Sequence, residues 1–191
     1  MDAQIERSKI VVRWIVAVLL FGTVVYLKQR GEVHVAWPPI LLLTALLALL
    51  NAVYGVILRR GAAPGWLKYV TTASDVALIS ALTALTGGTR SIFYVAYFIV
   101  LISNSFRYGM GMALYVALVY NLGYAAVVFV APPGGDLTVE AVKILAFWGI
   151  ALYAGYLATR FQRQARILQS YEETILRLRH EIAQLRPPAP G

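Results

Sequence analysis

The chain has 191 residues, of which 60% are hydrophobic and only 14% charged, and its mean hydropathy is +0.69. Soluble domains carry roughly 25% charged residues, so this composition excludes a water-soluble globule and predicts one integral membrane domain. The sequence has no cysteine, and its two histidines, His34 and His180, lie far apart, which excludes disulfides and thiolate or His-rich metal sites. We therefore expect no metal ion and no cofactor.

Six apolar segments are long enough, or nearly so, to cross a bilayer, which takes roughly 20 residues of helix. They are residues 10–27, 35–58, 66–85, 91–106, 109–131 and 139–159. Each break between them carries Gly, Pro or charge, as turns at a water interface do. The first segment lacks a small-residue cleavage site, so we expect it to stay in the membrane. The sequence thus predicts an all-α, polytopic six-helix transmembrane bundle over residues 1–159.

A tight hairpin is predicted where the apolar pattern breaks at Gly87, Gly88, Thr89 and Arg90. With six spans, both termini lie on one side of the membrane. The three loops on the other side hold four basic residues, Lys28, Arg30, Arg90 and Lys143. The N-terminus and the remaining two loops hold seven, Arg7, Lys9, Arg13, Arg59, Arg60, Lys68 and Arg107. Because positive charge accumulates on the cytoplasmic side, we expect both termini in the cytoplasm and the protein in the inner (plasma) membrane.

The sixth span runs on without a helix breaker until Pro187, which predicts a cytoplasmic helix over residues 160–186 and a Pro-rich tail over 187–191. Apolar residues recur along this helix at steps of three and four, namely Phe161, Ala165, Leu168, Tyr171, Ile175, Leu178, Ile182 and Leu185. Two successive steps of three, at Ala165, Leu168 and Tyr171, form a stammer, which overwinds a supercoil locally. We predict a parallel homodimer through this coiled coil.

The alternative for the same segment is an amphipathic tail lying on anionic lipid. Its apolar seam is narrower than the broad face of an interfacial helix, which favours the coiled coil. Six of the 17 Lys and Arg residues follow residue 159. As partners of the chain we expect the lipid bilayer, a second copy and a cytoplasmic output module, and no nucleic acid.

Asp75 lies about nine residues into the third span. An intramembrane carboxylate is costly and usually faces the bundle interior or a partner; if unpaired, it would be protonated, because desolvation disfavours the charge. Two interpretations stay open: a proton- or ligand-responsive switch, or a structural hydrogen bond to Asn51, Asn104, Asn121 or a tyrosine. We expect Arg13, near the inner end of the first span, to snorkel to the interface.

Four aromatic residues follow the hairpin, namely Phe93, Tyr94, Tyr97 and Phe98. We expect them on one face of the fourth span near its outer end, where they could line a pocket for an apolar or quinone-like ligand. The alternative is that they form the interfacial aromatic belt or pack the bundle.

The stretch from Asp75, DVALISALTALTGG, is followed by SIFYVAYF from Ser91 and by FRYGMG from Phe106. This pattern resembles the six-span membrane input domain of bacterial sensor histidine kinases, including those that regulate type IV pili; similar bundles precede cyclases. The resemblance covers about residues 60–130, and the whole chain in layout. It implies that the last span continues as a signalling helix into a cytoplasmic output module.

The segment after Thr159 is too short for an ATP-binding or cyclase domain. His180, Glu181 and Ile182 match the first three positions of a kinase phosphoacceptor box, but the residues from Gln184 to Arg186 do not match the rest. We interpret His180 as a surface residue of the coil, and we expect the chain to be non-enzymatic. A kinase or cyclase domain would then belong to a longer protein.

These features lead us to expect a dimeric sensor or transducer domain in which a stimulus shifts the packing of the spans. The continuous helix would then rotate or change register, with the stammer as its soft point. A rival interpretation is a small six-span transporter or substrate-capture subunit, which is the size of the vitamin-binding components of modular importers. A third is a structural subunit of a larger membrane complex, docked by its tail.

Overall fold

The computed structural model describes residues 3–59, 64–131 and 137–185, without the side chains of residues 3–8, 180 and 182–185. Within these ranges the chain is all-helical, as predicted, with six α-helices and two 3₁₀ helices. The α-helices are α1 (Ala3–Gln29), α2 (Trp37–Arg59), α3 (Leu67–Leu85), α4 (Ala96–Tyr108), α5 (Met110–Val130) and α6 (Leu137–Leu185). The 3₁₀ helices, η1 (Gly88–Arg90) and η2 (Ile92–Val95), lie between α3 and α4. Apart from the start of α1, the helices match the predicted segments to within a few residues.

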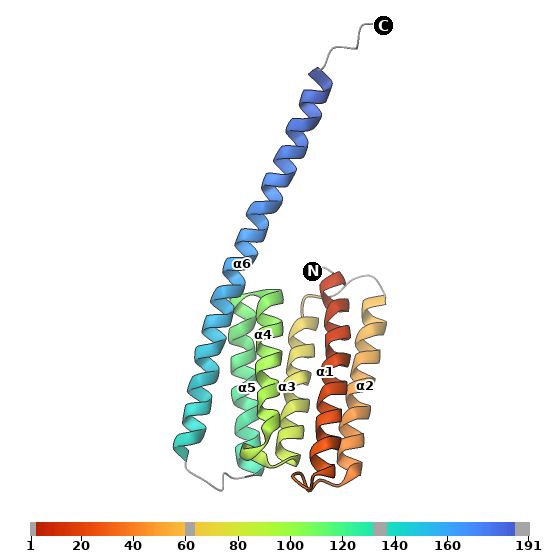
Figure 1. The fold of residues 1–191 in the computed structure, drawn as a ribbon, viewed down its shortest axis with the longest axis vertical. Coiled ribbons are helices and arrows are strands. Elements are labelled where there is room, and N and C mark those ends of the chain that lie inside the picture. The colour runs from red at the N-terminus through yellow and green to blue at the C-terminus, as the bar shows by residue number, and fades with distance from the viewer. Residues whose placement is uncertain (1–2, 60–63, 132–136, 186–191) are drawn as a thin grey trace.

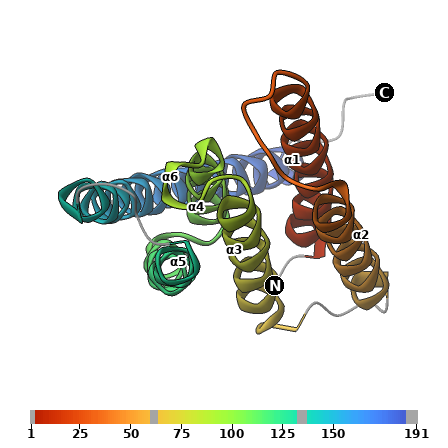
Figure 2. The same cartoon turned by 90° about the horizontal axis from the view of Figure 1, so that it is seen from below.

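The helices lie side by side in one bundle, and α6 projects far beyond it (Figure 1). We call the end where α1 begins, and from which α6 projects, the terminal end, and the end that holds η1 the turn end. Seen along the bundle, α3 lies between the α1–α2 pair and the group formed by α4, α5 and α6 (Figure 2).

Four helices are long and apolar enough to cross a membrane: most of α1, all of α2 and α5, and the greater part of α6. The segment Ile92–Tyr108 is apolar but shorter. Helix α3 carries several polar residues, and Thr71, Thr72 and Ser80 are buried. An interior helix tolerates such groups where they find acceptors; Ser80 Oγ, for example, donates to the Val76 carbonyl at 2.8 Å. The four apolar helices mark the chain as membrane-associated.

Helix α6 is a single α-helix of 49 residues, so the predicted domain boundary at residue 159 falls inside one unbroken element. The uninterrupted course predicted from the sixth span into the tail helix is therefore confirmed. From Arg160 to Leu185 the helix extends about 39 Å, at about 1.5 Å per residue. The Pro-rich tail, residues 187–191, lies outside the described residues.

The turn between α3 and η1 is built on two glycines with positive φ. Gly87 has φ +128° and Gly88 has φ +61°, backbone conformations that residues with a Cβ rarely adopt. A Cβ on Gly88 would lie 2.7 Å from the Cβ of Ala131, so Gly88 also allows the turn to approach the end of α5. This is the hairpin that the sequence predicted.

Helix α6 approaches α5 closely at Gly155. A Cβ there would lie 2.6 Å from Met110 Sδ and 2.9 Å from the Cβ of Ala113. Small residues at such crossings let membrane helices pack backbone to backbone. Gly149, on the same helix, has nothing within 4 Å of its Cβ position.

We predict that Gly155→Ala lowers the free energy of unfolding by about 1–3 kcal/mol, because the added methyl forces α6 away from α5. Gly149→Ala is the matched control and should leave stability unchanged or raise it by up to about 1 kcal/mol, because alanine favours the helix. Thermal unfolding in detergent, followed by circular dichroism, measures both. Equal effects of the two substitutions would contradict the close approach.

Candidate functional site

An ion pair joins α1 to α3 inside the bundle. Arg13 Nη2 lies 2.5 Å from Asp75 Oδ1, and the two side chains are only 8% and 11% exposed. The same Nη2 donates to the Thr71 carbonyl at 2.6 Å. The expected hydrogen bond from Asp75 to an asparagine or tyrosine is therefore replaced by a charge partner, and Arg13 does not snorkel. The reason lies in register: Arg13 shares the inward face of α1 with Lys9 and Val24.

Lys9, one turn before Arg13, also binds α3, and one of its partners there, Thr72, contacts α4. Its ammonium donates to the hydroxyls of Thr71 and Thr72 at 2.7 and 3.0 Å. The Thr72 hydroxyl lies 3.1 Å from Asn104 Oδ1 and 2.7 Å from the Lys68 carbonyl, and it can donate to one of them at a time. Asn104 thus belongs to the polar network around Asp75 without being its direct partner.

Asn51 of α2 joins the network through Arg13, whose Nη1 donates to Asn51 Oδ1 at 3.4 Å. The guanidinium also lies 4.9 Å from the ring centroid of Tyr54, a distance typical of a cation–π contact. Asn121 is placed elsewhere: its Oδ1 is buried with no hydrogen-bond partner among the described residues. The sequence therefore named three asparagines, of which the structure brings two to the Arg13–Asp75 pair.

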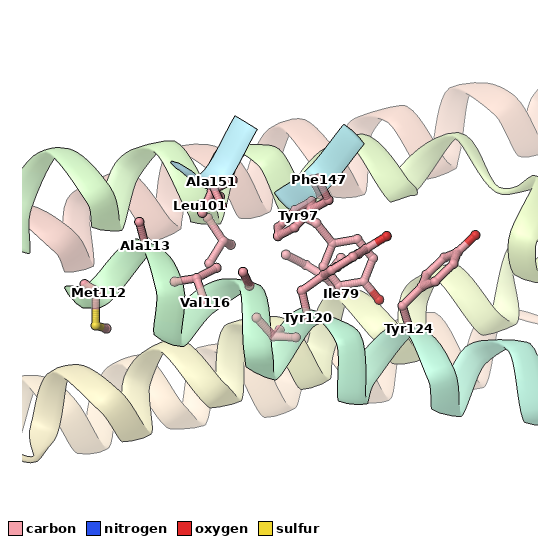
Figure 3. Packing of buried hydrophobic residues seen from close by; sticks show 14 residues of the cluster. Ile79, Tyr97, Leu101, Met112, Ala113, Val116, Tyr120, Tyr124, Phe147 and Ala151 are labelled. Atoms are coloured by element: carbon pink, nitrogen blue, oxygen red, sulfur yellow. The ribbon is translucent and has the colours of Figure 1, made fainter. Parts of the chain in front are cut away.

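The aromatic residues of the fourth span pack inside the bundle, and none of them lines the groove between α1 and α4. The Tyr97 ring meets the Tyr120 ring edge-on, with 4.9 Å between the ring centroids. The Tyr120 ring in turn stacks on Phe147 of α6, with 3.7 Å between the centroids (Figure 3). Tyr97 also donates to Ser80 Oγ at 2.8 Å, and Phe98 lies 5.2 Å from the Phe147 ring. These contacts agree with bundle packing, the second of the two interpretations.

Phe93 lies apart from these rings, in a separate cluster with residues of α1 and α2 such as Val24 and Ile40. The four aromatics therefore do not share one face, because η2 turns the chain before α4 begins. Tyr94 lies at the turn end, where it lines a hollow with Arg90, Glu140 and Lys143.

Lys143 binds α6 to the turn. Its ammonium donates to the Thr89 carbonyl at 2.6 Å and to both oxygens of Glu140 at 3.1 and 3.2 Å. It lies 3.3 Å from Tyr124 Oη, and that hydroxyl donates to Glu140 Oε2. We call Thr89, Tyr124, Glu140 and Lys143 the Lys143 cluster; it links η1, α5 and the start of α6.

The apolar seam on the projecting part of α6 is uncovered. Its described members Leu168, Tyr171, Ile175 and Leu178 are 51–64% exposed. Contact with a second copy stays a prediction, and the side chains of Ile182, Leu185 and His180 lie outside the described residues.

Sequence reasoning missed Arg13, Lys9, Glu140, Lys143, Tyr120 and Tyr124 as functional candidates. Two local signals could have found some of them. Lys9 and Arg13 are four residues apart at the start of the apolar part of α1, and Glu140 and Lys143 are an i, i+3 pair of opposite charge. Among the described residues, no group of three or more His, Cys, Asp and Glu side chains could hold a metal ion. Comparisons with known protein families, curated proteins and solved structures gave no match to the chain.

We predict that Asp75→Asn and Arg13→Gln each destabilise the protein by about 3–5 kcal/mol, because each leaves the other charge buried and unpaired. The double variant should recover part of this loss, since neither charge remains. A double-mutant cycle of thermal unfolding in detergent measures the coupling. Glu172→Gln, which removes an exposed carboxylate on α6, is the control and should be neutral. Additive effects of the two substitutions would argue against the pair.

Proposed function

We propose that the chain is the membrane sensor or transducer domain of a bacterial signalling protein. A stimulus at the turn end or within the membrane changes the packing of the helices. Helix α6 carries the change, as part of a homodimer, to a cytoplasmic output module. The observation that carries this proposal is that one unbroken helix both packs in the bundle and extends about 34 Å beyond Gln162, which still contacts α4.

The Lys143 cluster supports the input side of the proposal. It binds the first turns of α6 to a turn and to α5 through one ammonium group with four oxygen contacts. A ligand in the adjoining hollow, or a change in local charge, would compete for these contacts. Because α6 is continuous, a rotation imposed here turns the projecting seam as well.

The exposed seam supports the output side. Isolated helices are marginally stable in water, and their stability usually comes from packing an apolar face. Leu168, Tyr171, Ile175 and Leu178 provide such a face with a heptad-like spacing. A second copy, aligned in parallel, would cover it as in a two-stranded coiled coil.

Six spans in an inner membrane, with both termini in the cytoplasm, complete the proposal. Its support is the excess of Lys and Arg at the terminal end and the position of α3 and α4 inside the bundle, alongside the four apolar helices (Figure 1). The resemblance to sensor histidine kinase input domains points to a kinase or cyclase as the output module. The chain itself is proposed to be non-enzymatic.

The first prediction concerns the seam. We expect the full chain to be a dimer in detergent by light scattering, and Ile175→Lys to make it monomeric, because a lysine would place charge in the interface. Leu176→Lys is the matched control: Leu176 is 64% exposed but lies off the seam, so the dimer should persist. Truncation after Gln164 should also give a monomer. A full chain that is monomeric would remove the signalling helix from the proposal and favour the transporter or structural subunit.

The second prediction concerns the Lys143 cluster. The chain has no cysteine, so single-cysteine variants at residues 174–178 can report which positions face the partner helix through disulfide cross-linking. We expect maxima at Ile175→Cys and Leu178→Cys, and a shifted pattern when Lys143→Met is added. Lys28→Met removes another turn-end lysine, which donates to the Val35 carbonyl and not to α6, and should leave the pattern unchanged. Identical patterns in all three backgrounds would contradict transmission through α6.

A further inference from the structure

A groove runs along the bundle between α1 and α4, with α2 and α3 as its other walls, and none of its lining comes from α5 or α6. The cavity volume is about 130 Å³. From Lys9 to Val24, the groove follows α1 for about 22 Å, longer than the hydrocarbon of one leaflet, about 15 Å or half the bilayer core. Its length matches that of one extended acyl chain, and its volume holds part of such a chain, so the remainder would lie along the open side of the groove.

The two ends of the groove differ in chemistry. In the half nearer the terminal end its polar lining comprises Lys9, Arg13, Asp75, Ser103, Asn104 and Arg107, with Arg13 and Asp75 the deepest. Towards the turn end the lining is apolar and comprises mainly Leu20, Phe21, Val24, Ile40, Leu43 and Leu82. The polar end therefore lies where a lipid head group would be, and the apolar part lies at the depth of its chain.

Arg107 adds positive charge at the polar end, where basic residues outnumber carboxylates. Asp75 is the one carboxylate in the lining of the groove, and it is paired with Arg13. Arg107 is half-buried, and its single hydrogen bond to the described residues is from Nη1 to Ser103 Oγ at 2.8 Å. A guanidinium has five N–H donors and binds phosphate oxygens with two of them in parallel.

We infer that this groove binds one anionic phospholipid from the leaflet at the terminal end, with its phosphate on Arg107 and one acyl chain along α1. An apolar helix of another copy in the groove would leave the arginine without a counter-charge, which is costly away from water. A neutral ligand would form no ion pair with Arg107 and so would gain no binding energy from its charge. The inference goes beyond the proposed function, since binding requires neither dimerisation nor an output module.

The bound lipid would also fill the space between the α1–α2 pair and α4. Helix α1 packs mainly on α2, whereas α4 packs on α5 and α6. An acyl chain between α1 and α4 therefore adds apolar contact between two parts of the bundle that α3 and the Arg13–Asp75 network otherwise connect. Lipid composition would then affect the stability of the whole bundle.

The test measures lipid retention by the purified full chain with native mass spectrometry after exchange into detergent containing phosphatidylglycerol or phosphatidylcholine. We expect one phosphatidylglycerol per chain to be retained in preference to phosphatidylcholine. Arg107→Gln should weaken this binding about tenfold, the loss expected for a charge-assisted contact. Arg160→Gln is the matched control, because it removes an exposed arginine of α6 at the same end; it should have no effect.

A second pair of variants tests the apolar part. Ala17 lines the groove, so Ala17→Phe should fill it and lower phosphatidylglycerol retention, whereas Leu19→Phe, at a position 64% exposed on α1, should not. Equal retention of both lipids would overturn the inference. So would binding that neither Arg107→Gln nor Ala17→Phe weakens, or retention of oleate or inorganic phosphate without phosphatidylglycerol. Circular dichroism and a monodisperse elution profile confirm that each variant is folded.

Discussion

The ion pair between Arg13 and Asp75 is the interaction on which the arrangement of the bundle depends most. It joins α1, which otherwise packs mainly on α2, to α3 at the centre of the molecule. In a membrane, two separated charges at this depth would each be costly, and together they satisfy one another. The same guanidinium contacts Asn51 of α2, so the Arg13 side chain connects α1, α2 and α3.

The rest of the bundle is held mainly by close packing, with the Lys143 cluster as a polar contact at the turn end. Gly155 lets α6 approach α5, and Tyr97, Tyr120 and Phe147 fill the space between α4, α5 and α6 (Figure 3). The molecule therefore combines a tightly packed group, which includes the proposed output helix, with a peripheral pair attached through polar contacts. In the proposed signalling role, the packed group would move as a unit in response to a change at the Lys143 cluster.

Much of the fold follows from the sequence, because an apolar stretch of this length, bounded by glycine, proline or charge, has few stable conformations other than a membrane helix. The near agreement at α2 and α5, and the uninterrupted α6, come from that constraint. The partner of Asp75 could not be read in the same way, since Arg13 is 62 residues away along the chain and the two meet only through tertiary packing. Lys143 was counted as a loop charge, whereas its place in the second turn of α6 directs it to the Thr89 carbonyl. The four aromatics failed to share a face because η2 interrupts the regular helical period.

The length of α6 makes it a lever. A tilt of about 5° where it leaves the bundle, after Gln162, would displace its far end by roughly 3 Å, over an arm of about 34 Å. Two such helices joined along their seam cannot tilt apart without losing the contacts that join them. Rotation about the long axis keeps the two helices parallel and meets no such obstacle. Dimerisation would thus suppress bending of the two helices and leave rotation about the long axis as the motion that reaches the proposed output module.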